Sequence, residues 1–192
     1  TTAGAVAIQT VAGDLTVSQA LMANGGDHVL LKASGALTVN AQVTSSGVTG
    51  AVSLLSGSAQ TYGAAGDVTA GLGIDAEAGY NVTGTSALTM DAGTVFLTQG
   101  GVIRLIADGS LVLGLLDTRK TSDATQWGLV GVNSQSGSVT QAATLAGNAV
   151  YGSGARVEAA TGVGTSTQAL TTEVIRLAAK TTSGGVYVTE AS

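Results

Sequence analysis

The chain has 192 residues, enough for one domain, and only 10% of them are charged, against about 25% in a typical soluble domain. The formal net charge of -5 argues against a nucleic-acid partner, because proteins that bind nucleic acid carry basic patches. The absence of cysteine excludes disulfides and thiolate catalysis. No apolar stretch reaches the roughly 20 residues that a membrane-spanning helix needs.

Alternation of apolar and polar residues between glycine-rich turns predicts a chain made of short strands. In chain order, we expect strands at 6–11, 15–17, 29–33, 37–40, 52–55, 68–70, 87–91, 95–98, 102–107, 111–115, 129–132, 139–141, 157–159, 174–178 and 186–189. In the stretch 170–180 the apolar residues fit a strand period as well as a helical one, and we assign this stretch to strand. The 29 glycines supply tight turns, and the lack of proline suits strands that donate every ladder hydrogen bond.

Matching phrases recur about every 22 to 23 residues, as in Leu15 and Leu37, Val29 and Val52, and Leu88 and Leu111. A repeat of this length with two or three short strands is typical of a parallel β-helix, or β-solenoid. We therefore predict an all-β fold in which residues 1–192 form a single β-solenoid segment. Its inward residues are expected to be Leu15, Val17, Leu37, Val39, Val52, Leu54, Leu88, Met90, Leu111 and Leu113. The residues between them, Thr16, Thr38, Ser53 and Thr89, should face solvent.

The two ends of such a rod would expose unpaired strand edges, which natural solenoids cover with polar caps. Residues 6–11 and 186–189 have the composition of interior strands. We therefore expect the segment to belong to a longer array or to a subunit that stacks end to end.

The polar stretch 117–127 interrupts the repeat and contains Arg119, Lys120 and Trp127, the last being the only tryptophan. We predict that it is a loop inserted into one coil. Insertions in solenoids often gather on a binding face, so these three residues are our candidate binding site.

The most specific phrases of the chain are 160–166 (ATGVGTS), 170–174 (LTTEV), 177–179 (LAA) and 184–189 (GGVYVT). They resemble the repeats of giant bacterial surface proteins of the filamentous-haemagglutinin-like type, and residues 13–55 resemble them more loosely. The resemblance implies a right-handed parallel β-helix at the bacterial cell surface, with an adhesive or structural role. The Asn-Pro motifs of that family's secretion domain have no match here, because the chain lacks proline.

The candidate catalytic groups do not form a recognisable set. Asp75 and Glu77 should share one strand face, while most other carboxylates adjoin glycine and suit turns. His28 is the single histidine and is expected at a solvated strand edge. We predict no catalytic residues, no metal ligands and no cofactor. Calcium bound at scattered aspartate-bearing turns stays open, because the calcium-binding roll signature occurs once and weakly, at 71–75.

These observations favour a non-enzymatic, extracellular structural or adhesive segment of a bacterial adhesin or filament. Its expected partners are other copies or neighbouring repeats, and surface glycans or other cell-surface molecules. Two alternatives stay open. One is a polysaccharide-cleaving β-helix, which needs acids and a basic residue converging on neighbouring coils. The other is a glycan-binding module that uses Arg119, Lys120 and Trp127.

Overall fold

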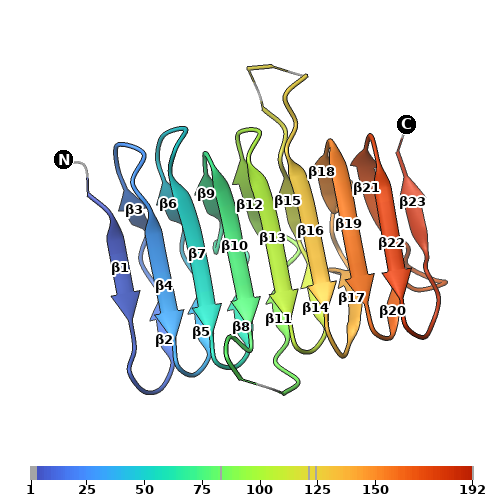
Figure 1. Cartoon of the computed structure of the whole chain (residues 1–192), viewed down its shortest axis with the longest axis horizontal. Coiled ribbons are helices and arrows are strands. Elements are labelled where there is room, and N and C mark those ends of the chain that lie inside the picture. Colours follow the sequence, from blue (N-terminus) through green and yellow to red (C-terminus); the bar gives the residue numbers. More distant parts are fainter. Residues whose placement is uncertain (1–3, 83, 121, 124, 192) are drawn as a thin grey trace.

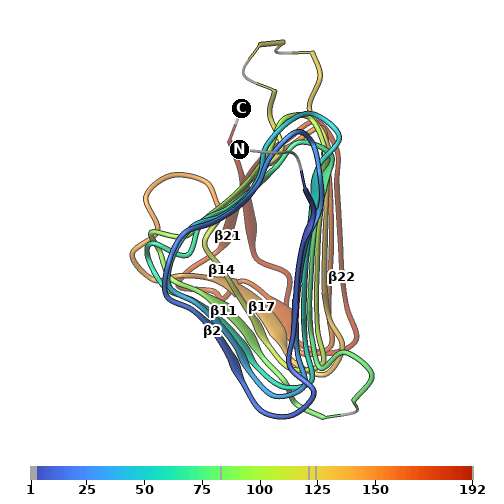
Figure 2. The same cartoon turned by 90° about the vertical axis from the view of Figure 1, so that its left-hand side faces the viewer.

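The chain is a right-handed coil of parallel strands. The structure, a computed structural model, describes residues 4–82, 84–120, 122–123 and 125–191. Within these residues the chain forms strands β1 to β23 and no helix, wound into eight coils along one axis (Figure 1). Seen from the N-terminal end, the chain turns clockwise as it recedes (Figure 2), the hand that parallel crossovers prefer. The predicted all-β parallel β-solenoid is confirmed.

Three parallel sheets form the sides of a narrow, roughly triangular tube (Figure 2). The first sheet contains β1 (Val6–Gln9), β4 (Val29–Ala33), β7 (Ala51–Ser56), β10 (Gly73–Ala78), β13 (Val102–Ala107), β16 (Leu129–Ser134), β19 (Gly154–Ala159) and β22 (Leu177–Thr181). The second contains β2 (Leu15–Val17), β5 (Leu37–Val39), β8 (Gln60–Tyr62), β11 (Leu88–Met90), β14 (Leu111–Leu113), β17 (Ser138–Gln141) and β20 (Gly162–Val163). The third contains β3 (Leu21–Ala23), β6 (Val43–Ser45), β9 (Val68–Ala70), β12 (Val95–Thr98), β15 (Leu115–Asp117), β18 (Val150–Gly152), β21 (Leu170–Val174) and β23 (Val188–Glu190).

The three residue pairs from which the repeat was predicted are true partners in the strand register. Leu15 is paired with Leu37, Val29 with Val52, and Leu88 with Leu111, so residues one repeat apart are neighbours in the ladder. Like residues therefore stack about 4.8 Å apart along the axis. Of the predicted inward residues, all are buried except Leu15, which is half-buried because it lies in the first coil. The outward positions are exposed or half-buried, as predicted.

Two of the predicted strands are wrong in their bounds because the chain turns a corner inside them. The expected strand 111–115 is split into β14 and β15 at Gly114, where an added Cβ would lie 2.5 Å from the Thr94 carbonyl oxygen. The expected strand 174–178, and the longer stretch 170–180, span the corner between β21 and β22. Ile175 at that corner is 74% exposed.

Six strands were not predicted: the six-residue β10, and five of the shortest strands in the fold, β3, β6, β8, β18 and β20. Each of these five has two or three residues and at most one outward side chain. Alternation over so few residues cannot be told from chance, which is why three strands of the third sheet, β3, β6 and β18, were missed.

The core is thin and built mainly of Val, Leu, Ile and Ala. Beside the edge where the first sheet turns into the second, one inward row holds only small residues through the six central coils: Ala33, Ser56, Ala78, Ala107, Ser134 and Ala159. All six are buried. The narrow space at this corner excludes large side chains from this row.

A buried polar pair interrupts the aliphatic core in the third coil. Gln60 occupies the row of Leu37 and Leu88 and is fully buried. Its amide nitrogen donates to the carbonyls of Leu54 (2.8 Å) and Glu77 (2.7 Å), and its oxygen accepts the Tyr62 hydroxyl at 2.6 Å. The Tyr62 ring packs edge-on against Phe96, with centroids 4.9 Å apart. Burial raises the pKa of Tyr62 well above its usual value, so the hydroxyl keeps the proton that it donates.

Replacing Gln60 with leucine should therefore destabilise the protein, although leucine matches the rest of the row. The Tyr62 hydroxyl would lose its acceptor, and the free energy of unfolding should fall by about 1–3 kcal/mol. The double variant Q60L/Y62F removes that stranded hydroxyl and should recover part of the loss. Urea unfolding of the three proteins measures both effects. Equal stability of Q60L and the unmodified protein would contradict the assigned role of the pair.

Candidate functional site

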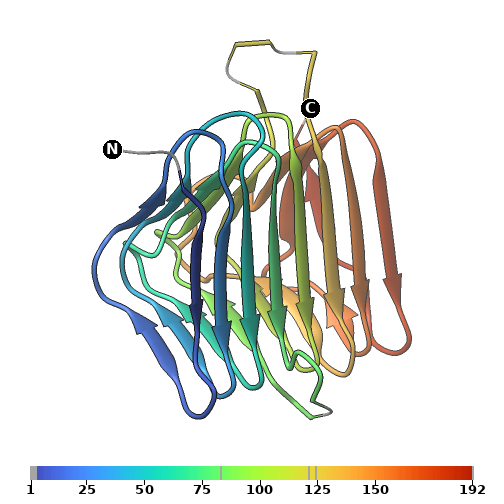
Figure 3. The same cartoon turned by 60° about the vertical axis from the view of Figure 1, so that its left-hand side comes forward.

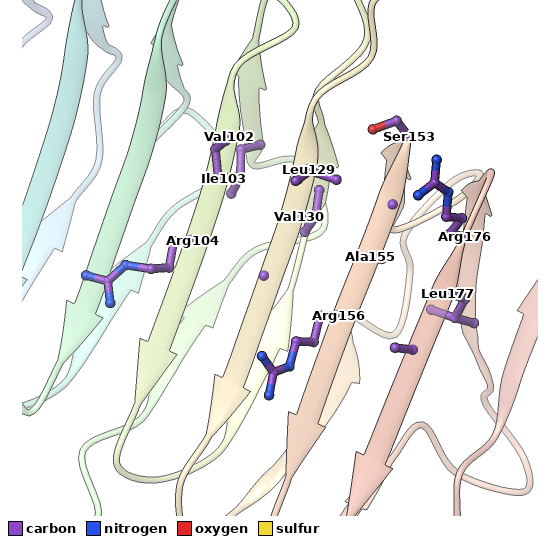
Figure 4. Close-up of a pocket in the computed structure, with 13 residues that line it drawn as sticks. Val102, Ile103, Arg104, Leu129, Val130, Ser153, Ala155, Arg156, Arg176 and Leu177 are labelled. Carbon is purple, nitrogen blue, oxygen red and sulfur yellow. The ribbon is translucent and has the colours of Figure 1, made fainter.

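The outer face of the first sheet carries an apolar groove that crosses strands β13, β16, β19 and β22 (Figure 4). Its volume is about 490 Å³, within the usual range for small-molecule sites. Val102 and Leu129 form its most exposed apolar walls, with 48% and 55% of their surface accessible. The groove runs along the rod axis, across the strands rather than between them.

The groove exists because glycines occupy outward positions. One outer row contains Ser53, Asp75, Arg104, Gly131 and Arg156. Gly131 therefore leaves a gap between two long side chains. In an adjacent outer row Gly154 is the partner of Leu129, and an added Cβ there would lie 3.1 Å from a Leu129 methyl group. Around Gly131, an added Cβ would meet no atom within 4 Å.

Arg104 stands at the N-terminal side of the groove and is engaged by two carboxylates. Its Nε and a terminal nitrogen each lie 2.7 Å from an Asp75 oxygen, and Glu77 is 3.6 Å away. The hydrogen bond to Asp75, and then the charges of both acids, raise the pKa of Arg104. Asp75 and Glu77 do share the outer face of β10, as predicted.

The opposite side of the groove carries two more arginines. Arg156 binds Glu158 on its own strand at 2.7 Å. Arg176, just before β22, has no carboxylate partner among the residues that the structure describes. The groove thus has an aliphatic floor, two neutralised arginines on its rim, and one exposed cation at its C-terminal end (Figure 4).

The predicted binding residues Arg119, Lys120 and Trp127 lie together in the loop that projects from the rod after β15 (Figures 1 and 3). Two residues of the predicted 117–127 insertion, Thr121 and Ala124, lie outside the described residues. Arg119 and Trp127 face each other across an isolated antiparallel bridge. The Lys120 ammonium donates to the Gln126 side-chain oxygen at 2.6 Å.

Arg119 is held on three sides, which sequence alone did not indicate. Its guanidinium forms a double hydrogen bond with Asp117, at 2.9 and 2.7 Å. It lies 3.7 Å from the centre of the Tyr151 ring and 6.0 Å from that of Trp127. The hydrogen bond to Asp117 is the main cause that raises the pKa of Arg119. The guanidinium therefore fastens the base of the loop to the third sheet, and Trp127 and Tyr151 flank it.

The other candidate groups have structural surroundings. The Nδ1 atom of His28 accepts the Ala51 backbone N–H at 3.1 Å, which links two coils. Among the described residues, no three His, Asp or Glu side chains lie together in a way that would hold a metal ion. Asp75, the carboxylate of the single calcium-like phrase at 71–75, is bound by Arg104 instead. The described residues also contain no helix that could cross a membrane.

No family model, curated protein or solved structure matches the chain. The β-solenoid implied by the resemblance to filamentous-haemagglutinin-like repeats is present in the structure. Membership of that family stays a prediction.

Sequence reasoning missed the groove. Its signal was present, because Gly131 and Gly154 stand at outward positions of phrases whose other outward residues carry long side chains. Recognising it required the register between coils separated by insertions of unequal length. That register follows from the three-dimensional pairing and not from a constant spacing.

The role of Arg119 can be tested through the only tryptophan of the chain. In the variant R119Q, the two hydrogen bonds to Asp117 and the contact with both aromatic rings are lost, so Trp127 should become more exposed. We expect a red-shifted emission and roughly two-fold stronger quenching by acrylamide, in line with loss of a cation–π contact. K120Q removes a neighbouring charge without touching Asp117 and should leave the emission unchanged. An unchanged spectrum for R119Q would refute the fastening role.

Proposed function

We propose that this chain is a non-enzymatic structural segment of an extracellular bacterial rod or filament, extended by contacts between coils. The observation that carries the proposal is the state of the two ends. Within the described residues, β1, β2 and β3 at one end and β22 and β23 at the other are each paired with a strand on one side alone (Figures 1 and 3). Such edges are templates for further strands. The extracellular and bacterial setting is supported by the sequence resemblance.

The inward side chains at both ends are only partly covered. In the first coil Ile8 is 37% exposed, and Leu15 and Leu21 are half-buried. In the last coil Leu177 and Val186 are 39% and 45% exposed. These residues continue the inward rows that are fully buried in the central coils, so a further coil at either end would bury them. The hydrophobic effect then favours end-to-end contact.

The two ends are not equivalent. Glu190 of β23 pairs with Thr172, in the inward row that Val150 continues. Its carboxylate accepts the Thr172 hydroxyl and, at 2.7 Å, the Val174 backbone N–H. A coil added there would have to cover a carboxylate, which costs free energy unless its hydrogen bonds are kept. The N-terminal end has only apolar residues in the corresponding positions Leu21 and Ala23.

End-to-end contact predicts particles longer than one segment, in electron micrographs and in multiples of 18.5 kDa by light scattering. I8K places an ammonium in the inward row of the first coil and should reduce the product to single segments. V11K alters a turn residue that is 94% exposed and is the matched control. E190V removes the carboxylate from the inward row of the last coil and should lengthen the rods. Compact single particles from the unmodified protein at every concentration would overturn the proposal.

A glycan-binding role for the projecting loop is the second candidate. It is favoured by the grouping of Trp127 and Tyr151 around Arg119, because aromatic faces and a cation suit sugar rings and their acidic substituents. A polysaccharide-cleaving role finds less support. Asp75, Glu77 and Arg104 do converge on neighbouring coils, but Arg104 already occupies both oxygens of Asp75. General acid–base work needs a carboxyl group free to exchange its proton.

A glycan array tests the second candidate. W127A should weaken binding of acidic glycans by about five- to ten-fold, as expected for loss of an aromatic contact worth about 1 kcal/mol. The unmodified protein should release no new reducing ends or unsaturated products from the same glycans. An identical binding profile for W127A would reject the loop as the site. Product formation that D75N abolishes would favour the enzymatic alternative.

A further inference from the structure

The floor of the groove on the first sheet is mainly apolar. Strand β16 is hydrogen-bonded to β13 on one side and to β19 on the other, so its backbone groups are engaged. The Ser153 hydroxyl donates to the Gly128 carbonyl at 2.9 Å. The surface between these strands is lined by Val102, Leu129 and Ala178 and by the glycine positions. A molecule that lies on it must therefore present hydrocarbon.

A sugar chain does not fit this floor. Each hydroxyl that it buried would lose water without gaining a partner, which costs free energy. A peptide strand does not fit either, because the groove crosses the strands and leaves no open edge for main-chain pairing. A hydrocarbon chain has neither requirement. The distance from β13 to β22 is three strand spacings, about 14 Å, so the groove is long and shallow.

The charge at the end of the groove specifies the other part of the ligand. Arg176 is exposed and has no carboxylate partner among the described residues, whereas Arg104 and Arg156 are paired with acids. A guanidinium binds a carboxylate through two parallel hydrogen bonds. A hydrocarbon body on the floor would place an anionic head within reach of Arg176.

We propose that the groove binds a single-chain amphiphile, namely a free fatty acid whose chain lies against Val102, Leu129 and Ala178 and whose carboxylate meets Arg176. The site is independent of the end-to-end contacts, because the groove lies on the side of the rod.

The test is calorimetric titration of the full chain with laurate below its micelle concentration. G131L fills the gap between Arg104 and Arg156, and its side chain has room in the unliganded protein because no atom lies within 4 Å of the added Cβ. It should weaken laurate binding about ten-fold or more through steric exclusion. S53L adds the same side chain to the same outer row outside the groove and should bind like the unmodified protein.

The second variant, L129D, changes a side chain that is 55% exposed and should also abolish binding. Thermal melting verifies that each variant is folded. If both folded variants bind laurate like the unmodified protein, or if the unmodified protein does not bind laurate, the proposal is overturned.

The head group is tested separately. R176Q should weaken laurate binding about two- to five-fold, the effect of an exposed ion pair, and should leave dodecanol binding unchanged. K180Q removes a charge from β22 outside the groove and should change neither. Octanoate, with fewer methylenes to bury, should bind more weakly than laurate.

Two further arms distinguish other occupants. Binding to phosphatidylglycerol vesicles without binding to monomeric laurate would overturn the proposal in favour of a membrane surface. Binding to polygalacturonate that G131L abolishes would overturn it in favour of an acidic glycan.

Discussion

The constraint on which the rest of this structure depends is the in-register stacking of parallel coils. Each side chain has its counterpart about 4.8 Å above and below it, so residues form rows along the axis. Each side chain in a row must fit the space left by the side chains around it. The row of alanine and serine at one corner and the aliphatic rows of the other sheets are both consequences of this restriction. It also explains how a chain with few aromatics buries a continuous core.

Because of the same stacking, a single residue that departs from the repeat changes the surface of the rod. A glycine in an outer row is a gap between two neighbours, and two such gaps in adjacent rows make the groove around Gly131 and Gly154. Opposite charges one coil apart become ion pairs, as between Asp75 and Arg104. A polar insertion becomes an arm that leaves the rod, fastened at its base by Arg119. Specific surface chemistry therefore arises where the repeat is broken.

Much of the fold could be predicted from the sequence because the spacing between matching phrases reflects the pairing of strands in neighbouring coils. The pairs Leu15–Leu37 and Leu88–Leu111 were recognisable from spacing alone and are true ladder partners. Three strands of the third sheet, β3, β6 and β18, were missed because they are too short to show alternation. Arg119, Lys120 and Trp127 were found together because they are close in the chain. Tyr151 and Asp117 complete that cluster with Arg119. They are brought together by the pairing of β15 and β18, which no local sequence pattern predicts.

Gln60 and Tyr62 have a consequence for how the chain finds its native winding. In a repetitive sequence, a coil that slips onto the wrong neighbour still places valine against leucine, so apolar burial alone discriminates poorly between alignments. The glutamine amide is satisfied only when the carbonyls of Leu54 and Glu77 and the tyrosine hydroxyl converge on it. In any slipped alignment these polar groups would be buried without their hydrogen-bond partners. The buried polar pair in the third coil therefore favours the native alignment of the strands over slipped alignments.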